Sequence, residues 1–265
     1  MNVSERDEIA EVIEEYWERM AREGCGFTRP WLGLDRDLVR RYARGEAPSA
    51  PEPLDEMYPA GVLKDVEGRD VLCLASGGGQ QSAVFGLLGA RVTVVDLSES
   101  QLDADRRAAE HYGHQVATVR ADMRDLSALG GESFDLVYQA PSMAFVPDVR
   151  RVYGEVRRLL KPGGAYRVEY TNPAVEFVDL DGWDGEGYRI TVPYAEMVRR
   201  RDDGVTEFRH HLSDIFNGLI EAGLSIRRVE EGPHYRRGGA GARPGSWEHW
   251  LTYSAAFAVV AEAAG

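Results

Sequence analysis

The spacing of hydrophobic residues changes in a regular way between residues 70 and 170. Short apolar runs, which are typical of buried strands, alternate with longer stretches in which apolar residues recur every three or four positions, as on one face of a helix. This alternation predicts an α/β fold with a doubly wound, mostly parallel sheet and right-handed crossovers. We expect strands at 70–75, 91–96, 117–120, 134–139 and 165–170, and helices at 82–88, 99–112 and 146–160.

The chain before this region reads as helical. Residues 4–22 carry apolar side chains at helical spacing, with Ser4 as a candidate N-cap, and residues 31–43 form a second candidate helix. A proline-rich linker follows at 47–53. We therefore expect residues 1–60 to form an N-terminal helical cap in front of a main domain over residues 61–265.

The chain after this region departs from the alternation. Residues 171–212 carry strand-like runs on both sides of the turn at Asp202-Asp203-Gly204, which predicts an inserted antiparallel lid. A helix is then expected at 213–222 and strands at 224–230 and 251–260, separated by a long loop rich in glycine, arginine and proline.

Composition narrows the class of protein. With 265 residues and 43% hydrophobic content the chain can bury a sizeable core, and its net charge of -13 disfavours nucleic acid as a partner. Cys25 and Cys73 have no paired spacing and no histidine cluster beside them, so we expect no metal and a reducing, cytoplasmic location. The N-terminus does not resemble a signal peptide, and no apolar run approaches the ~18 residues of a membrane span. These features leave monomer and homodimer open.

A glycine-rich turn follows the first of the alternating strands, in the sequence VLCLASGGGQQS from Val71 to Ser82. Glycines at 77–79 would let a ligand approach the backbone, and the next helix would offer free N–H groups to an anion. A turn of this kind also occurs without any ligand. The segments that follow it favour a nucleoside as the ligand. Asp96 ends the next strand, where a carboxylate can accept both ribose hydroxyls. Asp122 and Met123 follow the third strand, where they suit the adenine ring.

Together these segments resemble the class I methyltransferases that use S-adenosylmethionine. The resemblance spans about residues 70 to 170 and rests on VLCLASGGG, VVDLS, ADM, FDLVYQAPS and LLKPGGAYRVEY in this order. It implies a Rossmann-like, seven-stranded sheet closed by a C-terminal antiparallel hairpin, S-adenosylmethionine as cofactor, and methyl transfer to a small-molecule acceptor. The small-molecule branch is the closer likeness, because Gln139-Ala-Pro-Ser142 differs from the Asn/Asp-Pro-Pro-Tyr/Phe motif of enzymes that methylate exocyclic or amide nitrogen.

The resemblance also implies roles for single residues. Ala75 and the glycines would line the methionine part of the cofactor, Asp96 would hold the ribose, and the sulfonium would lie above Gln139 and Ala140. Cys73 and Ala75 replace the acid and the glycine that are usual in the family, so the amides of Gln80 and Gln81 are candidates for contacts at that end. The predicted cofactor residues are Tyr16, Ala75, Gly77, Gly78, Gly79, Gln80, Gln81, Asp96, Leu97, Asp122, Met123, Gln139 and Ala140.

Two other functions remain open. The spacing Gly77-x-Gly79-x-x-Ser82 nearly matches a dinucleotide fingerprint, but its third position is serine and no Tyr-x-x-x-Lys pair follows for hydride transfer. Alternatively, the same pocket could bind S-adenosylmethionine without methyl transfer, as in a cyclase-like or regulatory protein.

Candidates for a general base lie outside the cofactor segments. His210 should share a strand face with Phe208 and point toward an apolar pocket, whereas His211 should point the other way. His211 and His249 are weaker candidates, and a histidine at the end of a strand is more often a structural hydrogen-bonding residue than a base. Other candidates for substrate contact are Tyr16 and Trp17, Arg236, Arg237 and Arg243 of the loop, and Trp247, Glu248 and Trp250.

Overall fold

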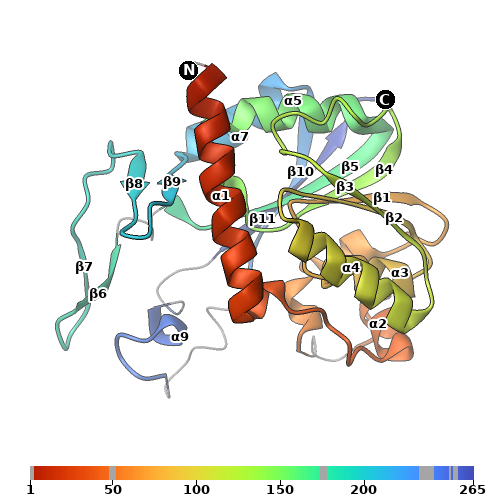
Figure 1. The fold of residues 1–265 in the computed structure, drawn as a ribbon, viewed down its shortest axis with the longest axis horizontal. Coiled ribbons are helices and arrows are strands. Elements are labelled where there is room, and N and C mark those ends of the chain that lie inside the picture. Colours follow the sequence, from red (N-terminus) through yellow and green to blue (C-terminus); the bar gives the residue numbers. More distant parts are fainter. Residues whose placement is uncertain (1–2, 48–51, 174–177, 233–241, 251, 253–255) are drawn as a thin grey trace.

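A seven-stranded sheet forms the centre of the computed structural model, which describes all residues except 1–2, 48–51, 174–177, 233–241, 251 and 253–255 (Figure 1). The strand order is β10-β11-β5-β4-β1-β2-β3. The five strands from β1 to β5 are parallel, and β11 pairs antiparallel with both β5 and β10. The predicted sheet with its C-terminal antiparallel hairpin is therefore confirmed. The bounds are β1 Asp70–Leu74, β2 Arg91–Asp96, β3 Val116–Arg120, β4 Phe134–Gln139, β5 Leu160–Tyr170, β10 Leu224–Glu231 and β11 Phe257–Ala263.

Helices cover both faces of the sheet (Figure 1). On one face lie α5 (Val149–Leu159) and α7 (Leu212–Glu221), and on the other lie α2 (Arg36–Ala43), α3 (Gln81–Leu87) and α4 (Glu99–Tyr112). α4 begins where Ser98 accepts the N–H of Gln101 and ends at Gly113, whose φ of +72° suits glycine. These caps explain why the predicted bounds of α4 are correct.

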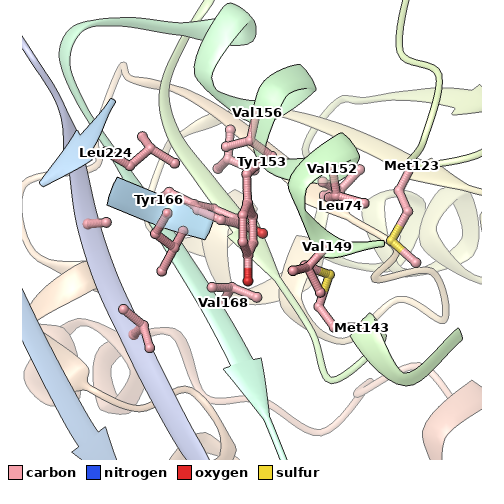
Figure 2. Packing of buried hydrophobic residues seen from close by; sticks show 14 of the residues in the cluster. Leu74, Met123, Met143, Val149, Val152, Tyr153, Val156, Tyr166, Val168 and Leu224 are labelled. Carbon is pink, nitrogen blue, oxygen red and sulfur yellow. The ribbon is translucent and has the colours of Figure 1, made fainter. Parts of the chain in front are cut away.

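The core has one half on each face because successive side chains of a strand point in opposite directions. In β1, Leu72 and Leu74 are buried toward α5, whereas Val71 and Cys73 are buried toward α3. Figure 2 shows the first half, where Tyr153 of α5 meets Tyr166 of β5 edge to face.

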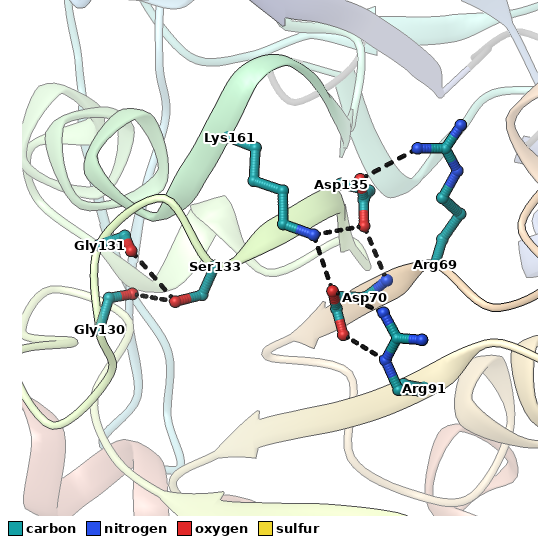
Figure 3. A network of polar contacts seen from close by, with 8 residues as sticks. All are labelled: Arg69, Asp70, Arg91, Gly130, Gly131, Ser133, Asp135 and Lys161. Atoms are coloured by element: carbon teal, nitrogen blue, oxygen red, sulfur yellow. Dashed lines mark hydrogen bonds and ion pairs between the residues drawn. The ribbon is translucent and has the colours of Figure 1, made fainter.

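Charged residues tie the strands together at their amino ends (Figure 3). Lys161 Nζ lies 2.7 Å from carboxylate oxygens of both Asp70, which begins β1, and Asp135 in β4. Arg91 pairs with Asp70 at 2.7 Å, and Arg69 pairs with Asp135 at 3.2 Å. The lysine of the LKPGG segment therefore has a structural position, at the sheet edge opposite to the carboxyl ends of the strands.

The N-terminal segment begins with α1 (Val3–Glu23), which lies between α4 and the lid (Figure 1). Glu18 accepts the hydroxyl of Ser98 at 2.7 Å and the N–H of Ser100 at 3.0 Å, and thereby anchors α1 on the start of α4. Ser4 lies inside α1 and is not its N-cap. α2 starts only at Arg36, because Asp35 caps it by accepting the N–H of Leu38.

Three short 3₁₀ turns, η1 (Gly26–Thr28), η2 (Leu54–Glu56) and η3 (Ala60–Leu63), connect this segment to the sheet. Val39 and Tyr42 of α2 and Leu54 of η2 belong to the same buried cluster as Val71 of β1. Much of the predicted cap therefore packs directly on the main core, and a boundary at residue 60 stays a prediction.

The described part of residues 171–212, the predicted lid, contains two separate hairpins. β6 (Val178–Trp183) pairs with β7 (Tyr188–Ile190), and β8 (Val198–Arg200) pairs with β9 (Thr206–Phe208) around the predicted turn. Near the C-terminus, α9 (Trp247–Trp250) occupies the region just before the predicted strand, and β11 begins only at Phe257. Within the described parts of the chain, no helix combines the length and apolar character needed to cross a membrane.

Candidate functional site

A cavity of about 570 Å³ opens where the carboxyl ends of β1, β2, β4 and β5 meet. This is the edge at which open α/β sheets bind ligands, and the volume lies within the usual range for small-molecule sites. The sheet supplies its floor, and α1, β9 and the C-terminal region supply its outer walls. The floor and inner wall include Ala75, Ser76, Gly77, Val95, Asp96, Leu97, Gln101, Met123, Ala140, Pro141 and Ser142.

The glycine-rich turn and the end of β2 meet at the cavity floor. Asp96 accepts the N–H of Gly77 at 2.9 Å and that of Ser98 at 3.0 Å. A Cβ on Gly77 would lie 2.8 Å from the Asp96 carboxylate and 2.6 Å from Gln101, so only glycine fits there. Burial raises the pKa of Asp96, although its backbone hydrogen bonds lower it. Ala75 adopts a φ of +46°, in the left-handed region that glycine enters at lower cost.

The outer part of the turn is held from behind by Asp105, a buried residue of α4. Its carboxylate accepts the N–H of Gly78 at 3.0 Å, the N–H of Gly79 at 3.1 Å and the hydroxyl of Ser82. Burial raises the pKa of Asp105 to about 7, against the hydrogen bonds that it accepts. Gly78 and Gly79 therefore differ from expectation: they lie outside the cavity lining, and their N–H groups are already bound.

Gln80 and Gln81 both line the cavity, as does Tyr16. The Gln80 amide donates to the carbonyl oxygens of Gly26 at 2.9 Å and Arg29 at 3.1 Å. Its Nε2 is therefore used to fix the N-terminal segment beside the turn.

Leu97 and Met123 line the part of the cavity expected for adenine, but Asp122 does not. Asp122 is bound by the guanidinium of Arg124, whose Nε lies 2.8 and 2.9 Å from the two carboxylate oxygens. Gln101, which the sequence analysis missed, is 5% exposed, and its Oε1 is buried with no hydrogen-bond partner among the described residues. Gln101 lines the cavity, and its buried Oε1 lies beside Gly78 in the outer part of the turn.

Gln139 and Ala140 have different surroundings, although Gln139 ends β4 and Ala140 comes directly after it. Ala140 lines the cavity, whereas the Gln139 side chain is turned into the core. There its oxygen accepts the Tyr166 hydroxyl and its nitrogen donates to Ser142 Oγ at 2.9 Å. Gln139 thus supports the floor from below and does not form its surface.

Of the three predicted histidines, the structure brings His210 to the cavity and places the other two elsewhere. His210 is 8% exposed and lines the cavity together with Phe208, as their alternation predicts. Its Nε2 lies 2.9 Å from the carbonyl oxygen of Met143, and burial lowers its pKa. His211 is stacked on Tyr194 with its Nε2 2.8 Å from the Tyr194 carbonyl, because successive side chains point in opposite directions.

His249 lies outside the cavity lining and contacts the aromatic side chains of Tyr188 and Trp183. Its Nδ1 lies 2.8 Å from the Tyr188 hydroxyl, and its ring meets the Trp183 ring edge to face at 4.7 Å. Arg243 is exposed, and Trp250 of α9 lines the cavity. Arg236 and Arg237 lie outside the described residues, as do the side chains of Trp247 and Glu248.

The outer half of the cavity combines aromatic and acidic side chains. Tyr16 and Trp17 of α1 contact each other and Phe145 of η4 (Met143–Phe145), with ring centroids 5.2 to 6.4 Å apart. The sequence analysis missed three lining carboxylates, Glu56, Glu169 and Glu207. Glu169 could have been found, since it lies near the carboxyl end of a parallel strand, where sites of this fold collect.

Comparisons with known proteins agree with this geometry. Residues 72–168 match the model of a family described as methyltransferase domain. An uncharacterised methyltransferase of Bacillus subtilis, YbaJ, is 32% identical over 222 residues, which cover 79% of this chain and 85% of that relative. A sterol 24-C-methyltransferase of Aspergillus fumigatus is 30% identical over 204 residues, and the match covers 71% of this chain but only 54% of that protein.

Solved structures resemble this chain over most of its length. A S-adenosylmethionine-dependent methyltransferase from Mesorhizobium loti has a TM-score of 0.61 and 26% identity, and the match covers 78% of this chain and 97% of the other. A 1,6-didemethyltoxoflavin-N1-methyltransferase from Burkholderia thailandensis, solved with its substrate and S-adenosylhomocysteine, has a TM-score of 0.61 and 18% identity, covering 98% and 90%. At that identity the second match bears on the fold alone.

Proposed function

This chain belongs to the class I S-adenosylmethionine-dependent methyltransferases, and from that premise we propose that it methylates a small molecule held in the outer half of the cavity. The observation that carries the proposal is the continuity of one cavity from the glycine turn and Asp96 to the aromatic wall around Phe145. Cofactor and acceptor would share this space, as a direct transfer requires. A relative named for sterol methylation is consistent with a small-molecule acceptor.

The residues at the inner end fit S-adenosylmethionine. Gly77, Asp96, Leu97 and Met123 line this end together. The buried, unpartnered Oε1 of Gln101 is a further acceptor next to them that can take a hydroxyl or amino group. We propose that Asp96 would hold the ribose, that Leu97 and Met123 would frame the adenine, and that Ala75, Gly77 and Ala140 would lie along the methionine part. Gln101 joins this set as a further contact to the nucleoside.

Bound S-adenosylmethionine supplies a methyl group that its sulfonium activates for in-line displacement. The residues of the chain then have to place the acceptor atom close to the methyl carbon and in line with it, which can account for much of the rate. The aromatic side chains Tyr16, Trp17 and Phe145 would orient the acceptor and exclude water.

His210 is the proposed base for an acceptor that must lose a proton. A carbonyl oxygen can only accept, so the neutral ring carries its hydrogen on Nε2, toward Met143, and keeps the lone pair of Nδ1. Its lowered pKa favours this neutral form near pH 7.

We also propose that residues 1–60 act as a cap, and residues 171–212 as a lid, of a main domain over residues 61–265. The proposed location of the protein is cytoplasmic. The net charge of -13 disfavours nucleic acid as a partner.

Calorimetry and mass spectrometry test the proposed function together. We expect S-adenosylmethionine and S-adenosylhomocysteine to bind the purified protein, and incubation with a pool of small metabolites to yield S-adenosylhomocysteine and a methylated product. Failure of both ligands to bind would reject the cofactor site. Binding without S-adenosylhomocysteine formation for any acceptor would favour a non-transferring role.

A further inference from the structure

The helix α1, which forms one wall of the cavity, is bonded to its neighbours on two different flanks. One flank carries Glu14 and Glu18, which lie one turn apart. Glu18 accepts hydrogen bonds from the start of α4, and Glu14 pairs with Arg120, whose Nε donates to the Leu97 carbonyl at 3.1 Å. Because Leu97 is proposed to frame the adenine, this flank is tied to the cofactor end of the cavity.

The other flank of α1 meets the β8–β9 hairpin, residues 198–208. Arg19 Nη2 lies 3.5 Å from Asp203 Oδ2 in the turn of this hairpin. Arg201, which directly follows β8, lies over the ring of Tyr16, 5.0 Å from its centroid. The same guanidinium donates to Asp203 Oδ2 at 2.8 Å and to Glu207 Oε1 at 3.0 Å. Arg201 is therefore the point at which the contacts between α1 and the hairpin converge.

Two walls of the cavity share Arg201 as a support. Tyr16 of α1 and Glu207 of β9 both line the cavity, and Arg201 touches both. A planar guanidinium can stack on a ring and bond two carboxylates at once, which the point charge of a lysine cannot do. Isolated exposed ion pairs stabilise proteins little, but here several contacts meet on one side chain that is only 30% exposed.

The hairpin needs such support because it is small. β8 and β9 contribute three residues each, and a two-stranded hairpin of this size is marginally stable on its own. Its position is set by the elements that it contacts, which include η4 beside β9 and α1 through Arg201. Phe208 ends β9 and His210 follows two residues later, and both line the cavity. The position of the hairpin therefore decides where the proposed base lies.

A ligand that contacts α1 and the sheet together favours the conformation in which α1 is in place. Since α1 lies between α4 and the hairpin, the same ligand should also hold the hairpin more firmly (Figure 1). Building on the proposed function, we propose that Arg201 is a positioning residue for methyl transfer. It transmits the closure of α1 over the bound cofactor to the acceptor wall at Glu207, Phe208 and His210, which then orients the acceptor.

Hydrogen exchange of the hairpin, measured by mass spectrometry with and without saturating S-adenosylhomocysteine, tests this coupling. The backbone N–H groups of Arg201 and Arg209 donate to the carbonyls of Val205 and Met197 at 2.8 and 2.7 Å, so peptides over 197–209 report on the hairpin. In the wild type the ligand should slow their exchange at least about fivefold. Arg201→Met should bind S-adenosylhomocysteine within about threefold of the wild type but show less than about twofold slowing.

Further variants separate positioning from charge. Arg199→Met removes a neighbouring cation that lies 3.8 Å from the same Glu207, and it should keep the slowing of the wild type. Arg201→Lys retains the charge without the planar group and should recover only part of the slowing. In a double-mutant cycle, Tyr16→Leu and Arg201→Met together should lose no more of the slowing than either alone, because each removes the same contact.

Three results would overturn the proposal: a hairpin whose exchange in the wild type is unaffected by S-adenosylhomocysteine, full slowing in Arg201→Met, or additive effects in the cycle. Full slowing in that variant would mean that η4 alone fixes the hairpin. Tyr16→Leu provides the same test from the side of α1 if Arg201→Met folds poorly. Failure of the wild type to bind S-adenosylhomocysteine at all would instead reject the proposed function itself.

Discussion

Asp105 in α4 accepts the backbone N–H of Gly78 at 3.0 Å, so that the helix after the second strand holds the turn after the first. Asp105 also lies close enough to Cys73 to contribute to raising the pKa of that buried thiol, after burial itself. Cys73 occupies the position at which the family usually has an acid. In this protein a carboxylate from α4 binds the outer part of this turn, at Gly78 and Gly79.

Asp105→Asn should change how stability depends on pH. The folded pKa of about 7 lies above the ordinary value near 3.9, so the folded protein retains a proton that the unfolded chain releases. The contribution of Asp105 is then fully present below about pH 4 and is lost as the pH rises through about 7. Between about pH 5 and about pH 8 the wild type should lose on the order of 2 kcal/mol relative to the variant. Urea unfolding at both pH values measures this difference, and parallel pH profiles would contradict it.

Asp96→Ala should weaken S-adenosylmethionine binding at least about tenfold, because it removes the charged acceptor proposed for the ribose hydroxyls. Asp96→Asn keeps the shape of the side chain but removes its charge. Comparing the two variants therefore separates the effect of the charge from the effect of side-chain volume. Asp103→Ala, on the exposed surface of α4, is the matched control. Calorimetry is the measurement, and unchanged affinity in both Asp96 variants would remove Asp96 from the site.

Gln101→Leu should change stability and affinity in opposite directions. Removing the buried, unpartnered Oε1 should raise the free energy of unfolding by about 1 kcal/mol, since an unsatisfied buried acceptor costs energy in the folded protein. The same change should weaken S-adenosylmethionine binding about tenfold if the cofactor supplies the missing donor. Thermal unfolding with and without cofactor shows both effects. A variant that binds as tightly as the wild type would count against Gln101 as a ligand-binding residue.

Local pattern predicted much of the fold but only part of the site. The bounds of β2, α4 and β4 follow from apolar runs and the Ser98 cap, which are properties of neighbouring residues. Contacts across the sequence are different: nothing near Asp105 indicates that it binds a turn 26 residues earlier. In the same way, Asp122 looks like a ligand-binding residue until Arg124 is seen to hold it.

The start of α2 also differs from the pattern of apolar residues. The segment at 31–35 has helical spacing, but Asp35 caps a later start, and the Trp31 N–H donates to Gly79 at 3.1 Å. Tertiary contacts therefore decide such boundaries, as they decide which of two adjacent histidines reaches the cavity.

Lys161→Met should make the protein more sensitive to acid. Hydrogen bonds from Arg91 and then from Lys161 lower the pKa of Asp70; in Asp135 burial raises the pKa, but Lys161 and other partners leave it lowered overall. Stability from these carboxylates is present above their ordinary pKa near 3.9 and is lost as the pH falls through the lower folded values. The variant should be less stable by about 1 kcal/mol at neutral pH, and this gap should shrink below about pH 4.

Acid titration followed by circular dichroism checks this prediction, with an unfolding midpoint at higher pH expected for Lys161→Met. Arg106→Met, which removes two exposed ion pairs on α4, serves as the control and should leave the midpoint in place. A gap between wild type and Lys161→Met that persists at low pH would contradict the assignment to these carboxylates.

Glu18→Ala should loosen α1 over the cavity. Glu18 bonds Ser98 and Ser100 at the start of α4, and α1 supplies Tyr16 and Trp17 to the cavity wall. Without this anchor S-adenosylhomocysteine should dissociate several-fold faster, while the sheet core keeps its stability to within about 1 kcal/mol, because the lost bonds join α1 to the start of α4 and do not belong to the sheet. Stopped-flow displacement and limited proteolysis of α1 measure the two effects. Glu11→Ala, on the exposed side of the same helix, should behave as wild type. If Glu18→Ala also behaves as wild type, α1 is held mainly by its aromatic contacts with Phe145 and not by its carboxylate.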